Sequence, residues 1–243
     1  MQEFLLKLGA SVLPNVMLGL AGYLVRAFDV SGFIVGTILG TVVTYAFGWG
    51  GFLVVLGFVV LGSATTRIGL NRKIARGIDE PGHGKRTWKN ALANLAVPAF
   101  GAAMALTVPG AMLNAMLRMF FTASVATAAC DTASSEMGKA FGTRVLTLHN
   151  MKAGEPGVPG GISLVGTASG AGAAVVIALV ALGFGLVAPG FAGYVVLSAL
   201  LASAAESLLK STVGFSSTHL ANVINTLLGG LFGALFWTGA STI

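Results

Sequence analysis

Charged residues are scarce in this chain of 243 residues, since Asp, Glu, Lys and Arg together make up 9% of it. Soluble domains carry about 25% charged residues, so this composition argues against an ordinary soluble enzyme. A hydrophobic content of 55% also excludes a disordered chain. The single cysteine, Cys130, excludes a disulfide scaffold. No HExxH or GxSxG motif is present, so zinc hydrolase and α/β-hydrolase chemistry have no support.

Long apolar stretches make up most of the sequence, and they indicate an all-α polytopic membrane protein. A membrane-spanning helix needs about 20 apolar residues, and eight such stretches fill most of the chain as a single domain. The 35 glycines suit closely packed membrane helices. The expected spans are 8–27, 30–47, 49–64, 91–108, 110–130, 165–187, 190–208 and 219–240.

The basic residues predict the topology. With eight spans, 12 of the 14 Lys and Arg fall on one side, seven of them in segment 65–90. The positive-inside rule then predicts that this segment and 131–164 are cytoplasmic, with both termini outside. The net charge of +6 is therefore explained by the orientation of the protein in the membrane and does not indicate nucleic-acid binding. Arg118 lies inside a span and should be paired or face a cavity. The N-terminus has no signal- or transit-like character, so a prokaryotic plasma membrane is expected.

The acidic residues gather on the same predicted face as the basic ones, which the positive-inside rule does not require. Polar groups of both signs at one face indicate a reaction or binding site there. The alternative is that charges simply lie where water is. The acidic residues of this face are Asp29, Asp79, Glu80, Asp131, Glu136, Glu155 and Glu206.

The segment DTASSEMGKAFG, residues 131–142, is a candidate metal and nucleotide site. Asp131 and Ser135 share a helix face at this spacing. Asp131 and Glu136 follow the expected end of the fifth span, where both could reach one ion, and carboxylates suit Mg²⁺ bound with a polyphosphate. Gly138 would let the backbone approach a ligand closely. A solvated helix end is the alternative.

A second segment, GHGKRTWKN, is a candidate phosphate clamp. Lys85, Arg86 and Lys89 place three cations within five residues beside flexible glycines. It is not a P-loop, because the first glycine of that motif is missing and Arg86 replaces the Ser or Thr. Non-specific binding of anionic lipid headgroups is the alternative. Asn90 and Asn94 follow as candidate nucleotide-binding amides.

Three further segments lie at predicted span ends. Gly160, Gly161 and Ser163 could offer backbone N–H groups to phosphate, whereas the GxxxG pair that follows, Gly166 and Gly170, favours helix packing.

Glu206 is four residues from Lys210, which is also the spacing of a simple helix ion pair. Asn222 and Asn225 share a helix face and could hold a nucleotide or metal ligand, or hydrogen-bond neighbouring helices.

The order RTWKNALAN, DTASSEMG, GGISLVGTASG, AESLLKS and NVINT resembles the integral membrane family that contains phytyl-phosphate kinase and transmembrane protein 19. The resemblance covers roughly residues 80–235. DTASSEMGKAFG is also similar to the DxxAxxxGxxxG element of dolichol kinase and related CTP-dependent polyprenol kinases. Asp131, Gly138 and Gly142 match that element, and Ser134 stands at its alanine position.

The resemblance implies transfer of a phosphoryl group from CTP or another NTP to a prenyl monophosphate, giving the diphosphate. Asp131 and Glu136 would hold the Mg²⁺–nucleotide, and Lys85 and Arg86 would neutralise phosphates. No protein nucleophile is expected. The implied nucleotide site is completed by Asn90, Asn94, Ser135, Gly138, Gly160, Gly161, Ser163, Glu206, Asn222 and Asn225.

The sequence is also compatible with other functions. A CTP-dependent polyprenol kinase would use the same site with a hydroxyl acceptor that needs a base, but the cations favour a phosphate acceptor. A cytidylyltransferase that acts on lipid phosphates is a third possible enzyme activity. A transporter usually binds near the midplane between repeated halves, and no clear repeat is visible here. The expected partners are the prenyl phosphate, the nucleotide and the bilayer, and a homo-oligomer is left open.

Overall fold

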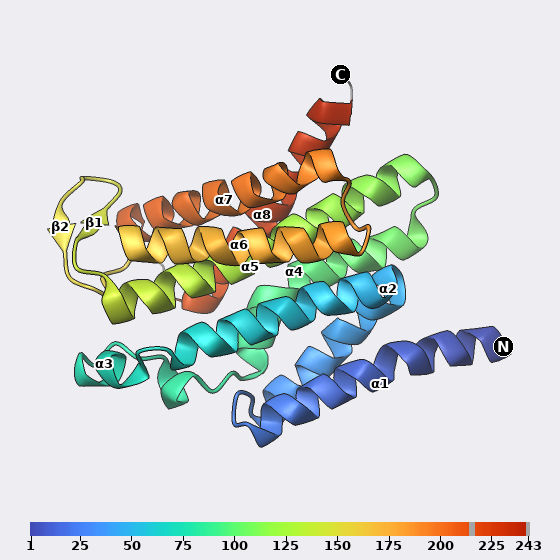
Figure 1. Ribbon diagram of the computed structural model, residues 1–243, viewed down its shortest axis with the longest axis horizontal. Helices are drawn as coiled ribbons and strands as arrows, with labels where there is room; N and C mark the ends of the chain where they lie inside the picture. The colour runs from blue at the N-terminus through green and yellow to red at the C-terminus, as the bar shows by residue number, and fades with distance from the viewer. Residues whose placement is uncertain (214–216, 242–243) are drawn as a thin grey trace.

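A computed structural model describes residues 1–213 and 217–241 as a bundle of long helices (Figure 1). Seven of the described helices are long and apolar enough to cross a membrane. The long helices are α1 (Gln2–Leu24), α2 (Val30–Arg67), α4 (Trp88–Thr107), α5 (Ala111–Phe141), α6 (Leu164–Gly183), α7 (Ala192–Thr212) and α8 (Thr218–Ser241). The short elements are α3 (Leu70–Ala75), η1 (Pro81–Gly84), β1 (Val145–Thr147), β2 (Ala153–Gly154), β3 (Gly161–Ser163) and η2 (Pro189–Phe191).

Helix α2 contains two of the expected spans. It breaks at Gly48, where φ is 63° and ψ is −150°, and the ribbon then turns back on itself (Figure 1). A positive φ of this kind is available to glycine at little cost. The two halves are packed so tightly that a Cβ on Gly51 would lie 3.0 Å from the Val43 carbonyl oxygen. The expected spans 30–47 and 49–64 thus correspond to the two arms of one kinked helix.

Helix α5 forms the centre of the bundle and contacts α2, α4, α6, α7 and α8. Its middle is completely buried, with Phe121 and Val125 at 0% exposure. The expectation that the helix ends with the fifth span at residue 130 was wrong, because the helix continues to Phe141. Residues 131–141 contain no proline, and Ala133 and Ala140 keep one face buried. Asp131 and Glu136 therefore lie within a continuous helix and not at a helix end.

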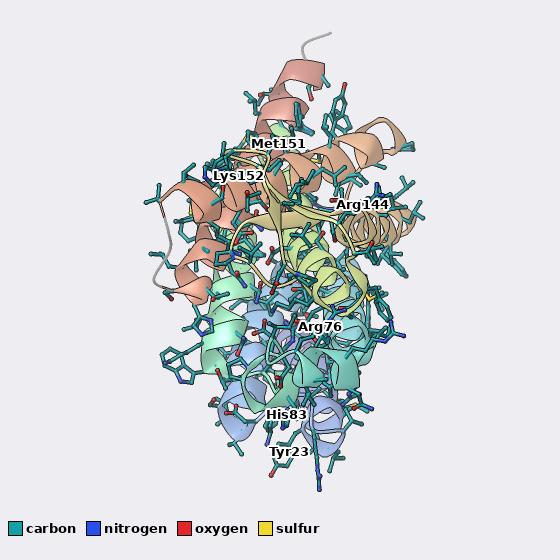
Figure 2. All side chains as sticks on the ribbon, turned by 90° about the vertical axis from the view of Figure 1, so that its left-hand side faces the viewer. Tyr23, Arg76, His83, Arg144, Met151 and Lys152 are labelled. Carbon is teal, nitrogen blue, oxygen red and sulfur yellow. The ribbon has the colours of Figure 1, made fainter. Side chains whose placement is uncertain are left out.

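The long polar segments, 68–87 and 142–163, lie at one end of the bundle, and the N terminus lies at the other (Figure 1). Seen from this polar end, Arg76 and His83 of the first segment lie on one side, and Arg144, Met151 and Lys152 of the second on the other (Figure 2). The second segment forms a small antiparallel sheet in the order β2-β1-β3. These strands are a minor addition to the expected all-α architecture.

Arg118 lies near the opposite end of the bundle and faces a cavity, as expected for a charged residue inside a span. Its Nε donates to Asn114 Oδ1 at 2.9 Å, and its guanidinium lies 5.8 Å from the centre of the Phe47 ring. The cavity has a volume of about 400 Å³ and is otherwise lined mainly by apolar groups such as Phe191 and Trp237.

Glycines bring α5 and α6 into backbone contact, as the GxxxG spacing predicts. A Cβ on Gly166 would lie 2.7 Å from the Ser134 carbonyl oxygen, and one on Gly170 would lie 2.7 Å from the Cys130 carbonyl oxygen. Gly138 contributes from the α5 side, since its Cβ would lie 3.2 Å from Ser163 Oγ. The two helices can approach this closely only because these side chains are absent.

Gly170→Ala is expected to destabilise the protein, because its methyl group would be forced against a backbone oxygen that cannot move aside. Overpacking of this kind costs about 1–3 kcal/mol. Gly172→Ala is the matched control, since nothing lies within 4 Å of its Cβ position and alanine favours a helix over glycine. Thermal unfolding in detergent should show a lower midpoint for Gly170→Ala only. Equal midpoints would contradict the packing account.

Candidate functional site

The polar end contains a cavity of about 800 Å³ that is walled by α4, α5, α7, α8 and the two polar segments. Every predicted site residue except Asn225 lines it, and Asn225 is hydrogen-bonded to one that does. The predicted residues in its wall are Lys85, Arg86, Asn90, Asn94, Asp131, Ser135, Glu136, Gly138, Gly160, Gly161, Ser163, Glu206 and Asn222. The structure thus brings together motifs that are up to 137 residues apart in the chain, from Lys85 to Asn222.

A buried ion pair holds the basic segment 68–87 against α5. Lys73, on α3, has 0% exposure, and its Nζ lies 2.5 Å from Glu136 Oε2. The same ammonium donates to the Thr66 carbonyl oxygen at 2.7 Å and to that of Thr65 at 3.3 Å. Lys73 thereby also binds the end of α2. Sequence analysis missed this residue, because nothing in its surroundings distinguishes it from the other six cations of segment 65–90.

Lys139 adds a second connection between the same elements. Its Nζ lies 2.6 Å from Glu80 Oε1 and 3.8 Å from Glu136 Oε1, while its carbonyl oxygen accepts from Arg76 Nη1 at 2.8 Å. Both oxygens of Glu136 therefore face lysine ammonium groups. Glu136 lines the cavity, as predicted, but its charge is already neutralised by the protein.

Arg86 is held by both its backbone and its side chain. Its N–H donates to the Ala27 carbonyl oxygen at 2.8 Å, and its carbonyl oxygen accepts from the Asp29 N–H at 3.0 Å. The guanidinium occupies space that a Cβ on Gly62 would take and lies 5.5 Å from the centre of the Phe58 ring. Burial lowers the pKa of Arg86, and the charges of Glu136 and Glu80 oppose that shift. A guanidinium keeps its charge under these conditions, so Arg86 is a fixed cation in the wall.

Asp29 helps to anchor this backbone connection. It is the N-cap of α2, and its Oδ1 accepts from the Gly32 N–H and from Ser31 Oγ, both at 2.7 Å. The Gly32 hydrogen bond lowers the pKa of Asp29 below its usual value. The capping carboxylate therefore stays ionised near neutral pH and stabilises the start of α2 beside Arg86.

A second polar group lies on the α7 and α8 side of the cavity. Glu206 has 1% exposure, and Lys210 Nζ lies 2.7 Å from its Oε1. Asn225 Nδ2 donates to Glu206 Oε2 at 3.2 Å. Asp131 lies close enough to interact with both Glu206 and Lys210. The carboxylate neighbour of Asp131 is therefore Glu206.

Several buried oxygens around this second group lack hydrogen-bond partners. Within the described ranges, no donor reaches Asn222 Oδ1 or Asn225 Oδ1. Asn225 has 1% exposure, so water does not readily replace the missing donor. Leaving such an acceptor unsatisfied costs about 1–3 kcal/mol. Oxygens of this kind beside a cavity are candidate groups for binding a ligand.

Other predicted residues shape the wall through local hydrogen bonds. Asn90 Oδ1 accepts from the Thr87 N–H at 3.0 Å in the capping box of α4, and Ser163 Oγ accepts from the Gly166 N–H at 3.1 Å at the start of α6. Gly160 has a φ of 70°, and a Cβ there would lie 2.7 Å from the Ser211 nitrogen. These positions fix the backbone around the cavity.

The fold and the cavity define a polytopic membrane protein with a cavity lined by charged residues at one end of its helices. The family described as integral membrane protein DUF92 matches residues 13–235, and the chain belongs to this family. The family resemblance carried by the sequence motifs is thereby confirmed.

Relatives come from bacteria, plants and archaea. A Synechocystis membrane protein, sll0875, is 33% identical over 79% of this chain and 76% of its own length. The chloroplastic protein VTE6 of Arabidopsis thaliana is 31% identical over 93% of this chain and 71% of its own. The Methanocaldococcus jannaschii membrane protein MJ0933 is 30% identical over 97% of this chain and 96% of its own length. No solved structure matches the chain significantly.

Lys73→Met should destabilise the protein strongly, because it leaves Glu136 buried without its main partner. Removing one member of a buried ion pair costs about 3–5 kcal/mol. Lys152→Met is the control, since Lys152 is an exposed lysine at the same end of the molecule (Figure 2). The unfolding midpoint in detergent should fall for Lys73→Met alone. A midpoint unchanged by Lys73→Met would contradict the anchoring role of the pair.

Proposed function

We propose that this protein is a prenyl-phosphate kinase of the membrane surface. It transfers the terminal phosphoryl group of CTP or another NTP to a prenyl monophosphate, such as phytyl or geranylgeranyl phosphate. The observation that carries the proposal is the enclosure of one cavity by cations, carboxylates and unpartnered amide oxygens at the end of the bundle. The cations in its wall are Lys85, Arg86, Lys89, Lys139 and Lys210.

The reaction requires charge neutralisation more than covalent chemistry. An oxygen of the acceptor phosphate forms a bond to the terminal phosphorus of the nucleotide, and the bond from that phosphorus to the bridging oxygen breaks. The products are the prenyl diphosphate and the nucleoside diphosphate. Arg86 is suited to a phosphate oxygen because its guanidinium is held in place before the substrate arrives. Lys85 and Lys89 are exposed at the rim, where an entering nucleotide would meet them.

The number of cations favours a phosphate acceptor over a free polyprenol. A polyprenol hydroxyl is neutral and needs a general base, whereas a monophosphate beside a triphosphate brings two highly charged groups together. Arg86 and the lysines of the wall offset that repulsion. No separate base is required, because the acceptor oxygen is already anionic.

The position of the cavity suits one lipid and one water-soluble substrate. A prenyl chain can lie along the apolar helices while its phosphate enters the polar end, and the nucleotide arrives from water. In this proposal the polar end faces the cytoplasm from a prokaryotic plasma membrane, and the positive-inside rule supports that orientation. Mg²⁺, when bound, would shield the nucleotide phosphates, and the carboxylate and amide oxygens of the wall are donors that fit it.

The test is product analysis with purified protein in nanodiscs, supplied with Mg²⁺, CTP and geranylgeranyl or phytyl monophosphate. We expect a prenyl diphosphate by mass spectrometry, lost roughly 100-fold or more in Arg86→Gln, where a fixed positive charge is removed. Asp131→Asn should lose activity as well. Lys152→Gln, outside the cavity, should keep it.

The outcomes separate the candidate functions. Phosphorylation of a free polyprenol, but not of the monophosphate, would establish the polyprenol kinase instead. Absence of product with any NTP would overturn the kinase proposal. Full activity of Arg86→Gln would remove this cavity as the site of the reaction.

A further inference from the structure

We propose that Asp131 and Glu206, with the side-chain oxygen of Asn225 beside them, form a divalent-cation site between α5, α7 and α8. This assignment rests on the proposed function, because the cation would bind the phosphates of the nucleotide. It replaces the sequence-based pair of Asp131 and Glu136 as the expected metal ligands.

The balance of charge separates the carboxylates of the cavity into two groups. Glu136 faces Lys73 at 2.5 Å, and Glu80 faces Lys139 at 2.6 Å, so each has a lysine partner of its own. On the α7 side, Lys210 is the one described cation that forms an ion pair with Glu206, and it also lies near Asp131. Two neighbouring carboxylates on the α7 side therefore have one lysine between them. A divalent cation would bind both carboxylates in their ionised form and offset the repulsion between them.

The geometry of α5 also separates Asp131 from Glu136. Five residues along an α-helix turn a side chain by about 500°, so the two carboxylates point roughly 140° apart around the axis. Glu136 points toward α3, where it meets Lys73, and Asp131 points toward α7, where it meets Glu206. The two carboxylates of α5 are therefore poorly placed to bind one ion together.

Asn225 supplies independent evidence for a ligand at this position. Its Nδ2 donates to Glu206 Oε2 at 3.2 Å, which fixes the amide beside the carboxylate. The other end of that amide, Oδ1, has no donor in the described part of the chain although the residue is 1% exposed. Asn222 Oδ1, one turn earlier on α8, is also without a partner and lines the cavity. Carboxylate and amide oxygens together are the donors that Mg²⁺ and Mn²⁺ prefer.

The ammonium of Lys210 would compete with a metal ion for the carboxylate of Glu206. Its ammonium lies 2.7 Å from Glu206 Oε1. The side chain is long and flexible, and Lys210 itself lines the cavity, so it can turn toward a phosphate when a cation takes over Glu206. The lysine would then exchange one anionic partner for another.

Mn²⁺ binding to the purified protein in nanodiscs tests the site without any turnover. Free Mn²⁺ is followed by electron paramagnetic resonance in the absence of nucleotide, and Mg²⁺ is added as a competitor. We expect one competitive site per chain, weakened at least about tenfold in Asp131→Asn and in Glu206→Gln. Glu80→Gln, which removes a carboxylate of the cavity wall that faces Lys139, should bind Mn²⁺ like the unchanged protein. Glu155→Gln, an exposed carboxylate outside the cavity, controls for non-specific binding.

Lys210→Met supplies a test that works in the opposite direction. Removing the competing ammonium should tighten Mn²⁺ binding several-fold, which a loss of folding could not do. Absence of a Mg²⁺-competitive site in the unchanged protein would overturn the proposal. So would weaker binding in Lys210→Met, or a loss in Glu80→Gln equal to that in Glu206→Gln.

The two proposals fail in different ways. If Mn²⁺ binds as expected but no nucleotide yields a prenyl diphosphate, the metal site stands and the kinase does not. If the diphosphate forms while Glu206→Gln binds Mn²⁺ normally, the kinase stands and this metal assignment is wrong.

Discussion

The buried ion pair between Lys73 and Glu136 is the interaction on which the polar end of this protein depends. A fully buried ammonium and a fully buried carboxylate are each very costly alone, so each requires the other. Lys73 also binds carbonyl oxygens at the end of α2, and the pair thereby fixes α2, α3 and α5 relative to one another. The cations of segment 68–87 are placed over the cavity as a consequence of that attachment.

Helix α5 provides the rigid wall on which the rest of the site is assembled. Its unbroken course to Phe141 carries Asp131 on one side of the helix and Glu136 and Lys139 on another. Glu136 and Lys139 face the basic segment and connect it to α5, whereas Asp131 faces Glu206 on α7. The charges that hold the structure together and the carboxylate proposed to bind a cation thus lie on different sides of one helix. This separation lets a protein with few charges use some for stability and others for the proposed site.

Much of the architecture was predictable because apolar length and charge distribution depend on composition and local order alone. The spans, the single polar end and the packing role of Gly166 and Gly170 follow from these patterns. The length of α5 was mispredicted, because loss of hydrophobicity after residue 130 was taken as the end of a helix. A helix that leaves the apolar layer can continue wherever tertiary contacts bury one face, as Ala133 and Ala140 do here.

The amino-acid order was enough to specify which residues gather at the cavity, since their motifs all fall at the same ends of predicted spans. Only the tertiary structure decided which of them face one another. Glu136 meets Lys73 from 63 residues away, and Asp131 meets Glu206 from 75 residues away. Such pairings depend on the rotation of each helix about its axis, and that rotation is set by packing against several neighbours at once.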